Sequence, residues 1–335
     1  MEAIKGRNAM KHSLKLALAS LSVLALAACS SGSPSSGGAA GESSDGNDAL
    51  QQITVGVIPI VDTAPIWLGE SKGFFADQGL DLEIETATGG SAIVPGIQSG
   101  SYDFDFSNLI SVMVANDKGL DMKFVANGIS TTGDVKSDVG SVLVKADSTI
   151  SSPKDLSGKK VSVNNLSNIG DTTVKSIVEE DGGDPSTVEF VEVAFPDAPA
   201  ALENGIVDAA WILEPFQSSA IAAGAKMLSA NFAEFSPELD VAGYFTSSKY
   251  AQENPEVTEK FTKAMNKSLE YAQEHPDEVR DIVGTYTKIS EDVRAEMILP
   301  RFRPDFNRDA VAKLGDAAQR YGTLSKPVDL EKLLP

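Results

Sequence analysis

Short stretches of alternating hydrophobic and polar residues recur through the first two thirds of the chain. Segment 52–60 (QITVGVIPI) alternates and predicts a strand, and Thr63 followed by Pro65 predicts a helix that ends at Lys72. The same reading predicts further strands over 80–86, 102–106 and 123–126, separated by helices that end at Gln98 and Asn116. Strands that alternate with helices in this way indicate an open, mostly parallel sheet.

The alternation of strands and helices then repeats. Predicted strands cover 140–145, 160–163, 188–193 and 207–212, and predicted helices cover 170–180, 198–202 and 215–224. After a strand over 241–247, only helical patterns follow, at 255–273, 276–286, 291–299 and 307–321. We therefore predict an α/β fold of two lobes joined by a two-crossing hinge. The predicted boundaries are 52–140 and 242–335 for the first lobe, the latter with the C-terminal helices, and 141–241 for the second.

The N-terminus predicts a lipoprotein signal peptide over residues 1–28. Lys5, Arg7, Lys11 and Lys15 form a basic region that overlaps the start of an apolar stretch, Leu14 to Ala28. This stretch is too short for a permanent transmembrane helix. The stretch ends in Leu26-Ala27-Ala28-Cys29, the pattern of a bacterial lipoprotein box. Cys29 is thus expected to carry the lipid, whether translation starts at Met1 or at Met10. Residues 29–51 then form a Ser/Gly/Ala-rich tether, so we expect an extracytoplasmic protein anchored to a bacterial membrane.

Composition argues against several function classes. The net charge of −20 is unfavourable for binding nucleic acid or anionic lipid. Cys29 is the single cysteine, and only His275 remains after the predicted signal, which argues against cysteine–histidine catalysis and His-rich metal sites. The phosphate-binding glycine motifs GxxxxGK[ST] and GxGxxG do not occur. We therefore expect that this protein is not an enzyme and that it binds neither a metal nor a cofactor.

Several strings resemble one known family. They are Pro65-Ile66-Trp67-Leu68 with Lys72-Gly73-Phe74-Phe75, then Gly89-Gly90-Ser91, Gly100-Ser101-Tyr102-Asp103-Phe104, Asp155-Leu156-Ser157-Gly158-Lys159-Lys160 and Trp211-Ile212-Leu213-Glu214-Pro215-Phe216. In this order, behind a lipobox, they resemble the periplasmic binding proteins of nitrate, sulfonate and taurine importers and of thiamine-pyrimidine-precursor importers. The resemblance implies a type II periplasmic-binding-protein fold whose lobes close on a ligand. It also implies an ABC permease and ATPase as partners, and we expect a monomer.

Ligands of open α/β sheets bind beyond the carboxyl ends of the strands. The predicted ligand contacts in the first lobe are Asp62, Thr63, Trp67, Gly90, Ser91, Ser107 and Asn108. In the second lobe they are Asn165, Ser167, Asn168, Asp171, Phe195, Asp197, Ala198, Trp211 and Glu214. Helix capping is an alternative role for Ser91, Ser107, Asp197 and Glu214, and core packing is an alternative for the two tryptophans.

Two ligand classes stay open. The predicted contacts contain four carboxylates and no Lys or Arg, which slightly favours a neutral or cationic pyrimidine-like heterocycle. A sulfonate-, nitrate- or taurine-like anion is also possible, held by helix N-termini and hydroxyl groups. The function predicted is capture of a small solute for an ABC importer. Its alternative is a ligand-sensing or partner-binding surface lipoprotein that is not coupled to transport.

Overall fold

The computed structural model describes residues 50–87 and 89–335, without the side chains of residues 90–93. The predicted signal peptide and Cys29 lie outside these residues. The described residues belong to one compact unit. In the described part, no helix is both long and apolar enough to cross a membrane.

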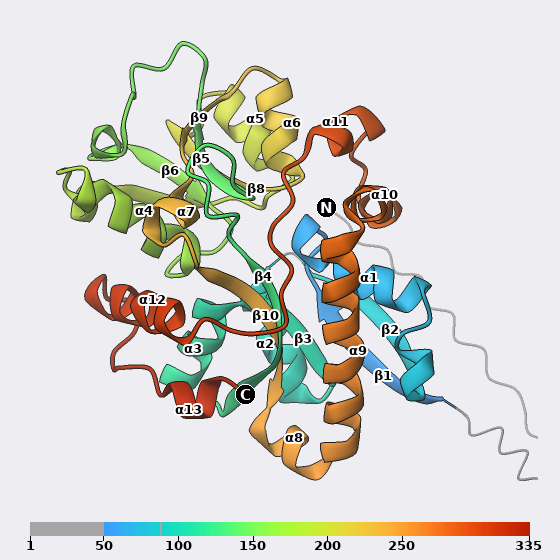
Figure 1. Cartoon of the computed structure of the whole chain (residues 1–335). Coiled ribbons are helices and arrows are strands. Elements are labelled where there is room, and N and C mark those ends of the chain that lie inside the picture. The colour runs from blue at the N-terminus through green and yellow to red at the C-terminus, as the bar shows by residue number, and fades with distance from the viewer. Residues whose placement is uncertain (1–49, 88) are drawn as a thin grey trace, which may run out of the picture. The chain divides into compact units, whose positions relative to one another are not determined.

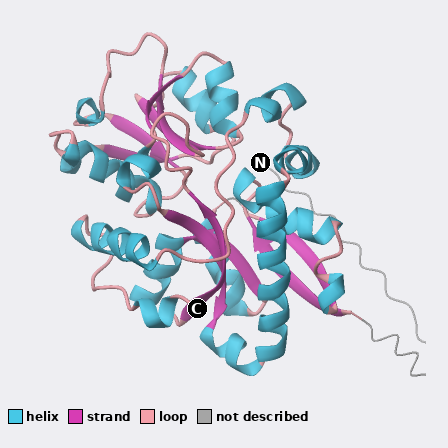
Figure 2. Cartoon of the chain, in the orientation of Figure 1, coloured by secondary structure: helices cyan, strands magenta, loops and turns pink. Residues whose placement is uncertain are grey.

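The strands form two five-stranded mixed sheets (Figures 1 and 2). The first has the order β2-β1-β3-β10-β4, from β1 (Gln51–Val57), β2 (Leu80–Thr86), β3 (Phe104–Asn108), β4 (Met122–Ser130) and β10 (Asp240–Ser247). The second has the order β7-β6-β8-β5-β9, from β5 (Gly140–Val144), β6 (Lys160–Val163), β7 (Glu189–Glu192), β8 (Ala209–Leu213) and β9 (Lys226–Ser229). β10 runs antiparallel to β3 and β4, and β5 runs antiparallel to β8 and β9.

Burial along each strand follows its place in the sheet. The inner strands β8 and β10 are almost wholly buried, whereas the edge strand β2 alternates between partly buried and exposed residues. This difference explains the sequence patterns, since an inner strand needs apolar residues on both faces. One continuous hydrophobic core includes residues of both sheets, among them Val55, Phe106 and Trp211.

Short helices connect the strands. In the first part of the chain these are the 3-10 helices η1 (Val61–Thr63) and η2 (Ala76–Gln78), with α1 (Ala64–Ser71), α2 (Gly90–Ser99) and α3 (Leu109–Asp117). Between β5 and β10 they are η3 (Pro153–Leu156), α4 (Ile169–Glu180), η4 (Pro185–Thr187), α5 (Ala198–Glu203), α6 (Phe216–Ala222) and α7 (Asn231–Phe235). Asn108 caps α3 by accepting a hydrogen bond from the amide of Ser111.

The end of the chain is helical, as predicted. The helices are α8 (Ser248–Glu253), α9 (Pro255–Glu274), α10 (Pro276–Tyr286), α11 (Glu291–Glu296), α12 (Arg308–Arg320) and α13 (Leu330–Leu333). The apolar face of α9 includes Val257, Phe261 and Leu269, all buried. Phe261 stacks on Phe104 of β3 with ring centroids 4.0 Å apart, which fixes α9 on the first sheet.

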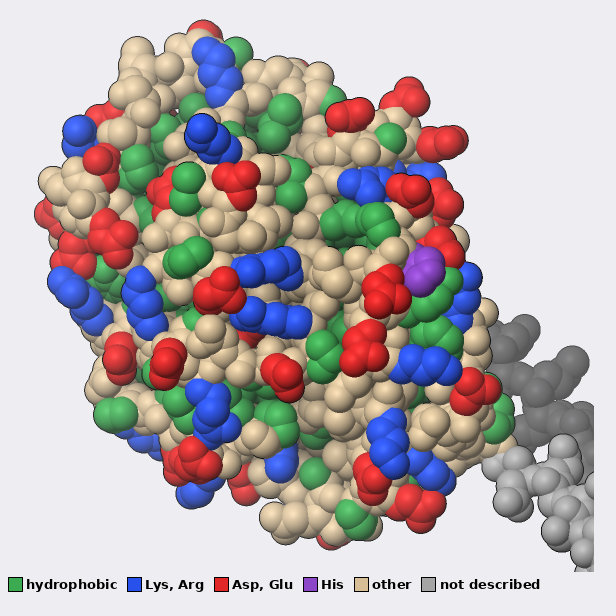
Figure 3. Space-filling view, in the orientation of Figure 1, with side chains coloured by type: hydrophobic (Ala, Val, Ile, Leu, Met, Phe, Trp, Pro, Cys, Tyr) green, Lys and Arg blue, Asp and Glu red, His purple; other side chains and the backbone are tan. Residues whose placement is uncertain are grey.

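Acidic and basic side chains are interspersed over the face shown in Figure 3. Many of them form exposed ion pairs, such as Lys267 with Asp77 at 3.2 Å and Lys263 with Glu259 at 2.7 Å. Exposed pairs of this kind contribute little to stability, because water and salt screen them.

Candidate functional site

A narrow cavity lies where the carboxyl ends of parallel strands from both sheets meet. Its volume is about 20 Å³, enough for a single water molecule. The lining residues are Ile58, Ile60, Asp62, Phe106, Asn108, Asn164, Ile169, Phe195, Trp211, Leu213, Phe232, Val241 and Ala242. Most of them lie in the last part of β1, β3, β6, β7 or β8 or in the segment that follows one of these strands. Phe232 belongs to α7, and Val241 and Ala242 lie at the start of β10. This is the position at which open α/β sheets place their ligands.

Asp62 is the one charged side chain of this lining. It lies in η1 and is 1% exposed, and its Oδ1 has no hydrogen-bond partner among the described residues. Burial raises the pKa of the Asp62 carboxyl to about 7, and the nearby charge of Asp138 adds to this increase. A buried carboxyl with a perturbed pKa and a free oxygen is characteristic of a functional site.

Aromatic rings form the wall contributed by the second sheet. Trp211 of β8 is 1% exposed and meets Phe195 and Phe232 edge-on, at centroid distances of 5.4 and 5.7 Å. Its Nε1 has no partner among the described residues. A Cβ on Gly170 would lie 2.4 Å from the Trp211 ring, so only glycine lets α4 approach this closely. The wall is closely packed and apolar, and it carries one N–H donor without a partner among the described residues.

Polar contacts cross from one side of the cavity to the other. Asn168, the N-cap of α4, donates from Nδ2 to Oγ of Ser111 in α3 at 3.0 Å. The amide of Val61 donates to the carbonyl of Glu214 at 3.2 Å. Gly89 lies so close to Asn165 that a Cβ there would be 2.7 Å from the Asn165 side-chain oxygen. The two halves of the site are therefore in contact in this structure.

Glu214 lies beside the cavity and does not line it. Its buried carboxyl accepts hydrogen bonds from Ser218, from Gln217 Nε2 at 3.2 Å and from the amide of Ile298 at 3.2 Å. Burial raises the pKa of Glu214. With these partners, Glu214 ties α6 to the C-terminal segment.

Thr63 and Trp67 also lie outside the lining. The Thr63 hydroxyl donates to the carbonyls of Ile58 and Ile60, which shapes the loop that carries Asp62. Trp67 stacks on Tyr286 with centroids 5.0 Å apart, and Tyr286 donates its hydroxyl to Ile60 at 3.0 Å. Thr63 directly, and Trp67 through Tyr286, therefore stabilise the loop that carries Asp62.

The other predicted contacts divide into three groups. Asp171 accepts from the amides of Ser167 and Asn168, so it shapes the turn before α4, in which Ser167 has a positive φ of 52°. Ser107 and Ala198 are buried but do not line the cavity, and Asp197 is exposed and makes no side-chain cap bond. Gly90 begins α2, and the Ser91 side chain lies outside the described part.

Sequence reasoning predicted Phe195 and Trp211 but missed the other apolar lining residues. Ile58, Ile60, Phe106 and Leu213 end or follow predicted strands, where hydrophobic residues read simply as core. Phe232 belongs to α7, a five-residue helix that the sequence pattern does not predict. A usable signal was present for Asn164, which directly precedes the predicted contact Asn165.

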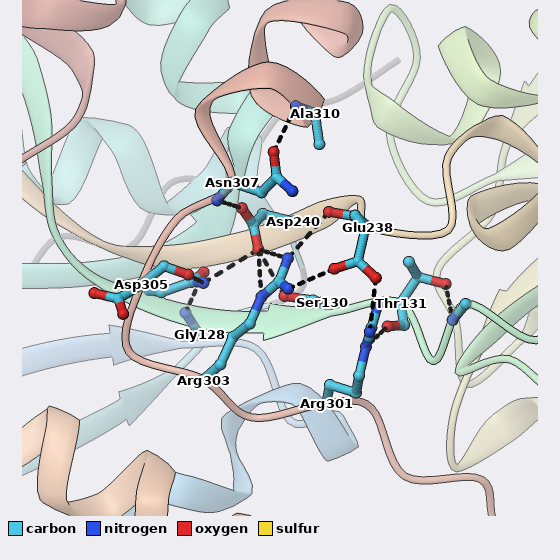
Figure 4. A network of polar contacts seen from close by, with 12 residues as sticks. Gly128, Ser130, Thr131, Glu238, Asp240, Arg301, Arg303, Asp305, Asn307 and Ala310 are labelled. Atoms are coloured by element: carbon cyan, nitrogen blue, oxygen red, sulfur yellow. Dashed lines mark hydrogen bonds and ion pairs between the residues drawn. The ribbon is translucent and has the colours of Figure 1, made fainter.

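A network of ion pairs and hydrogen bonds surrounds the chain segments that pass between the sheets (Figure 4). Asp240, at the start of β10, is fully buried and pairs with Arg303 Nη2 at 2.9 Å and Ser130 Oγ at 2.6 Å. Glu238 pairs with Arg303 at 2.8 Å and Arg301 at 3.0 Å, and these guanidinium groups lower its pKa. The network joins the end of β4, the start of β10 and the C-terminal segment.

A larger hollow of about 760 Å³ lies beside the C-terminal segment, lined by residues that include Asp117, Asp121 and Lys326. Two of its carboxylates already have hydrogen-bond partners: Asp117 accepts from Ser325, and Asp121 accepts from Ser248 at 2.8 Å. We therefore regard the cavity between the sheets as the candidate site. The described residues contain no cluster of three His, Cys, Asp or Glu side chains that could hold a metal ion.

The known proteins to which this chain is similar include binding proteins and pyrimidine phosphate synthases. A putative aliphatic sulfonates-binding protein of Bacillus subtilis is 27% identical over 300 residues, 87% of this chain and 86% of the relative. The formylaminopyrimidine-binding protein of Halalkalibacterium halodurans is 25% identical over 283 residues, 82% and 79% of the two chains. A 4-amino-5-hydroxymethyl-2-methylpyrimidine phosphate synthase of Saccharomyces cerevisiae is 25% identical over 230 residues, 63% of this chain and 64% of the enzyme.

Solved structures show the same fold. The ligand-binding component of an ABC-type import system from Staphylococcus aureus, solved with zinc bound, superposes with a TM-score of 0.73 at 15% identity, covering 85% of this chain and 96% of the other. The fold is that of type II periplasmic binding proteins, as the sequence predicted. The NMT1/THI5-like family model matches residues 60–279. The chain therefore belongs to the NMT1/THI5-like family.

Proposed function

We propose that this protein is the extracytoplasmic solute-binding component of an ABC importer. The observation that carries the proposal is the cavity at the carboxyl ends of both sheets, in which Asp62 Oδ1 and Trp211 Nε1 lack partners among the described residues. Such groups favour a polar ligand, since leaving them buried and unsatisfied costs free energy. The relatives that match most of this chain and bind sulfonates or formylaminopyrimidine support the same role.

Ligand uptake requires the site to open. At about 20 Å³ the cavity excludes any organic molecule, so the contacts that cross it must part and re-form around the ligand. We propose that the halves built on the two sheets move as lobes about the segments joined by the Asp240–Arg303 network. Ser111–Asn168 and Val61–Glu214 are the contacts that this opening breaks.

The remaining parts of the proposal concern the cell. Cys29 carries the lipid anchor, the tether 29–51 holds the folded unit near the membrane, and a permease with its ATPase receives the solute. Binding without catalysis is proposed, because the relatives that cover most of this chain are binding proteins. The yeast synthases match a smaller share of it.

The direct test is a thermal-shift screen of the purified protein against three groups of compounds. These are alkylsulfonates with nitrate and taurine, aromatic carboxylates, and pyrimidines with other nitrogen heterocycles. A micromolar ligand at millimolar concentration is expected to add roughly 4 kcal/mol to the apparent stability. A null result with all three groups would contradict the role as a solute-binding protein of this kind.

Transport itself is tested in cells. Deletion of the gene is expected to abolish uptake of the ligand identified in the screen, and the intact gene is expected to restore it. The variant Cys29→Ala should release the protein from the membrane fraction and reduce uptake. Unchanged uptake in the deletion strain would instead support a sensing or partner-binding lipoprotein.

A further inference from the structure

We infer that Asp62 selects the ligand class: the cavity takes a small flat molecule that directs an N–H donor or a cationic nitrogen toward Asp62, and it rejects anions. This inference rests on the proposed function and deepens it. The sulfonate-type anion and the nitrogen heterocycle are both compatible with the family. The groups around Asp62 distinguish between them.

The described surroundings of Asp62 contain no compensating positive charge. No Lys, Arg or His belongs to the cavity lining among the described residues. The ionisable groups that influence Asp62, or are influenced by it, are Asp138, Tyr244 and Tyr286, none of which is cationic. Their elements are the segment before β5, the inner strand β10 and helix α10. A buried carboxylate therefore lacks the counter-charge that it needs.

An anionic ligand would make this imbalance worse. A sulfonate or nitrate placed in the cavity would bring a second negative charge beside Asp62 in a desolvated environment, where repulsion is strong. It would be accommodated only with Asp62 protonated, and the pKa of about 7 makes that form partial at neutral pH. A donor or cation instead supplies the missing partner to Oδ1.

The aromatic wall determines the shape of the ligand. Trp211, Phe195, Phe106 and Phe232 provide flat apolar surfaces around a narrow space, which favours a ring. The free Nε1 of Trp211 is a donor only, so the ligand also needs an acceptor. An amino-substituted nitrogen heterocycle combines a donor, a lone-pair acceptor and a flat ring.

Isothermal titration calorimetry with compounds matched in size tests this inference. The probes are 4-aminopyrimidine and benzamidine on one side, and benzenesulfonate, taurine and nitrate on the other. The wild-type protein is expected to bind at least one of the first pair at least tenfold more tightly than any of the anions. Asp62→Asn keeps the size of the side chain and removes its charge, and it should weaken benzamidine binding at least tenfold.

Asp105→Asn is the matched control, because Asp105 is also fully buried with a raised pKa but lies outside the cavity lining. Asp105→Asn should leave the affinity for benzamidine within about twofold of the wild-type value. Tight binding of benzenesulfonate or taurine to wild-type protein would overturn the inference and leave the binding function standing. Equal loss in the Asp62→Asn and Asp105→Asn variants would also overturn it. Failure of every probe to bind would count against both this inference and the proposed solute-binding function.

Discussion

Asn168 Nδ2 donates a hydrogen bond of 3.0 Å to Ser111 Oγ. Asn168 caps α4, which follows β6 of the second sheet, and Ser111 lies in α3, which follows β3 of the first sheet. The bond therefore connects the two halves of the site. Both residues are buried. Asn168 also accepts from the amide of Ile169, while Ser111 donates its own amide to Asn108. This bond is one of the contacts that the proposed opening would break, and it uses the Asn168 side chain that also caps α4.

Ser111→Ala removes this bond and leaves the Asn108 cap in place. We expect ligand affinity to fall about three- to tenfold, equivalent to roughly 1 kcal/mol for one buried hydrogen bond. Faster ligand release in stopped-flow measurements should account for most of the change. Ser99→Ala is the control, since Ser99 is exposed at the end of α2 and its hydroxyl contacts only the neighbouring Gly96 and Ser101 among the described residues. An unchanged release rate in Ser111→Ala would contradict the proposed closure.

Asp62 makes the stability of the ligand-free protein depend on pH. Its folded-state pKa is raised from 3.8 to about 7, so the folded state holds a proton that the unfolded state has lost between those values. Compared with high pH, protonation of the Asp62 carboxyl adds stability to the folded state. This added stability is fully present below about pH 4 and is lost as the pH rises through about 7.

The variant Asp62→Asn should therefore match the wild type near pH 4 and exceed it above pH 7, by about 3 to 4 kcal/mol in the free energy of unfolding. Urea unfolding of both proteins from pH 4 to pH 8, without ligand, measures the difference. A difference that stays constant over this range would show that Asp62 is not buried as an unpaired carboxyl.

Arg303 compensates the charge of Asp240 in the network between the sheets. Asp240 is fully buried, so Arg303→Ala leaves an uncompensated carboxylate and should cost about 3 kcal/mol or more of stability. The double variant Arg303→Ala with Asp240→Asn should recover part of that loss. Arg308→Ala, which removes an exposed pair with Glu331, is expected to change stability by less than about 1 kcal/mol. Strict additivity of the two network substitutions would argue against their coupling.

Gly170 tests the packing of Trp211. Alanine in a helix is normally about 1 kcal/mol more stable than glycine. At Gly170 the added Cβ would lie 2.4 Å from the indole, so Gly170→Ala should destabilise by about 1–3 kcal/mol. Gly284→Ala is the comparison, because its new Cβ would meet the flexible end of the Arg294 side chain. Thermal unfolding of both variants gives the answer, and a stabilised Gly170→Ala would contradict the packing described.

The architecture was largely predictable, because hydrophobic periodicity records which strands are buried on both faces. The sequence indicated the strands β1, β5 and β10 and the helix α9 within a few residues. β9 and α7 were missed, since four- and five-residue elements carry too little periodicity.

Prediction of the site was less complete. Of the predicted ligand contacts, Asp62, Asn108, Phe195 and Trp211 line the cavity, whereas Thr63, Trp67 and Glu214 lie outside its lining and pack beside it. Position along a strand end is visible in the sequence, but the direction in which a side chain points from a loop is set by tertiary packing. The ligand role of all these residues remains a prediction.

The central claim, that ligand binds between the two sheets, is tested most directly by tryptophan fluorescence. The chain has two tryptophans, and Trp67→Phe leaves Trp211, which lines the cavity, as the only tryptophan. Titration of this variant with a ligand established by calorimetry is expected to change Trp211 emission in proportion to occupancy, with the calorimetric Kd. A calorimetric binding curve with no change in Trp211 emission would place the ligand elsewhere and contradict the account.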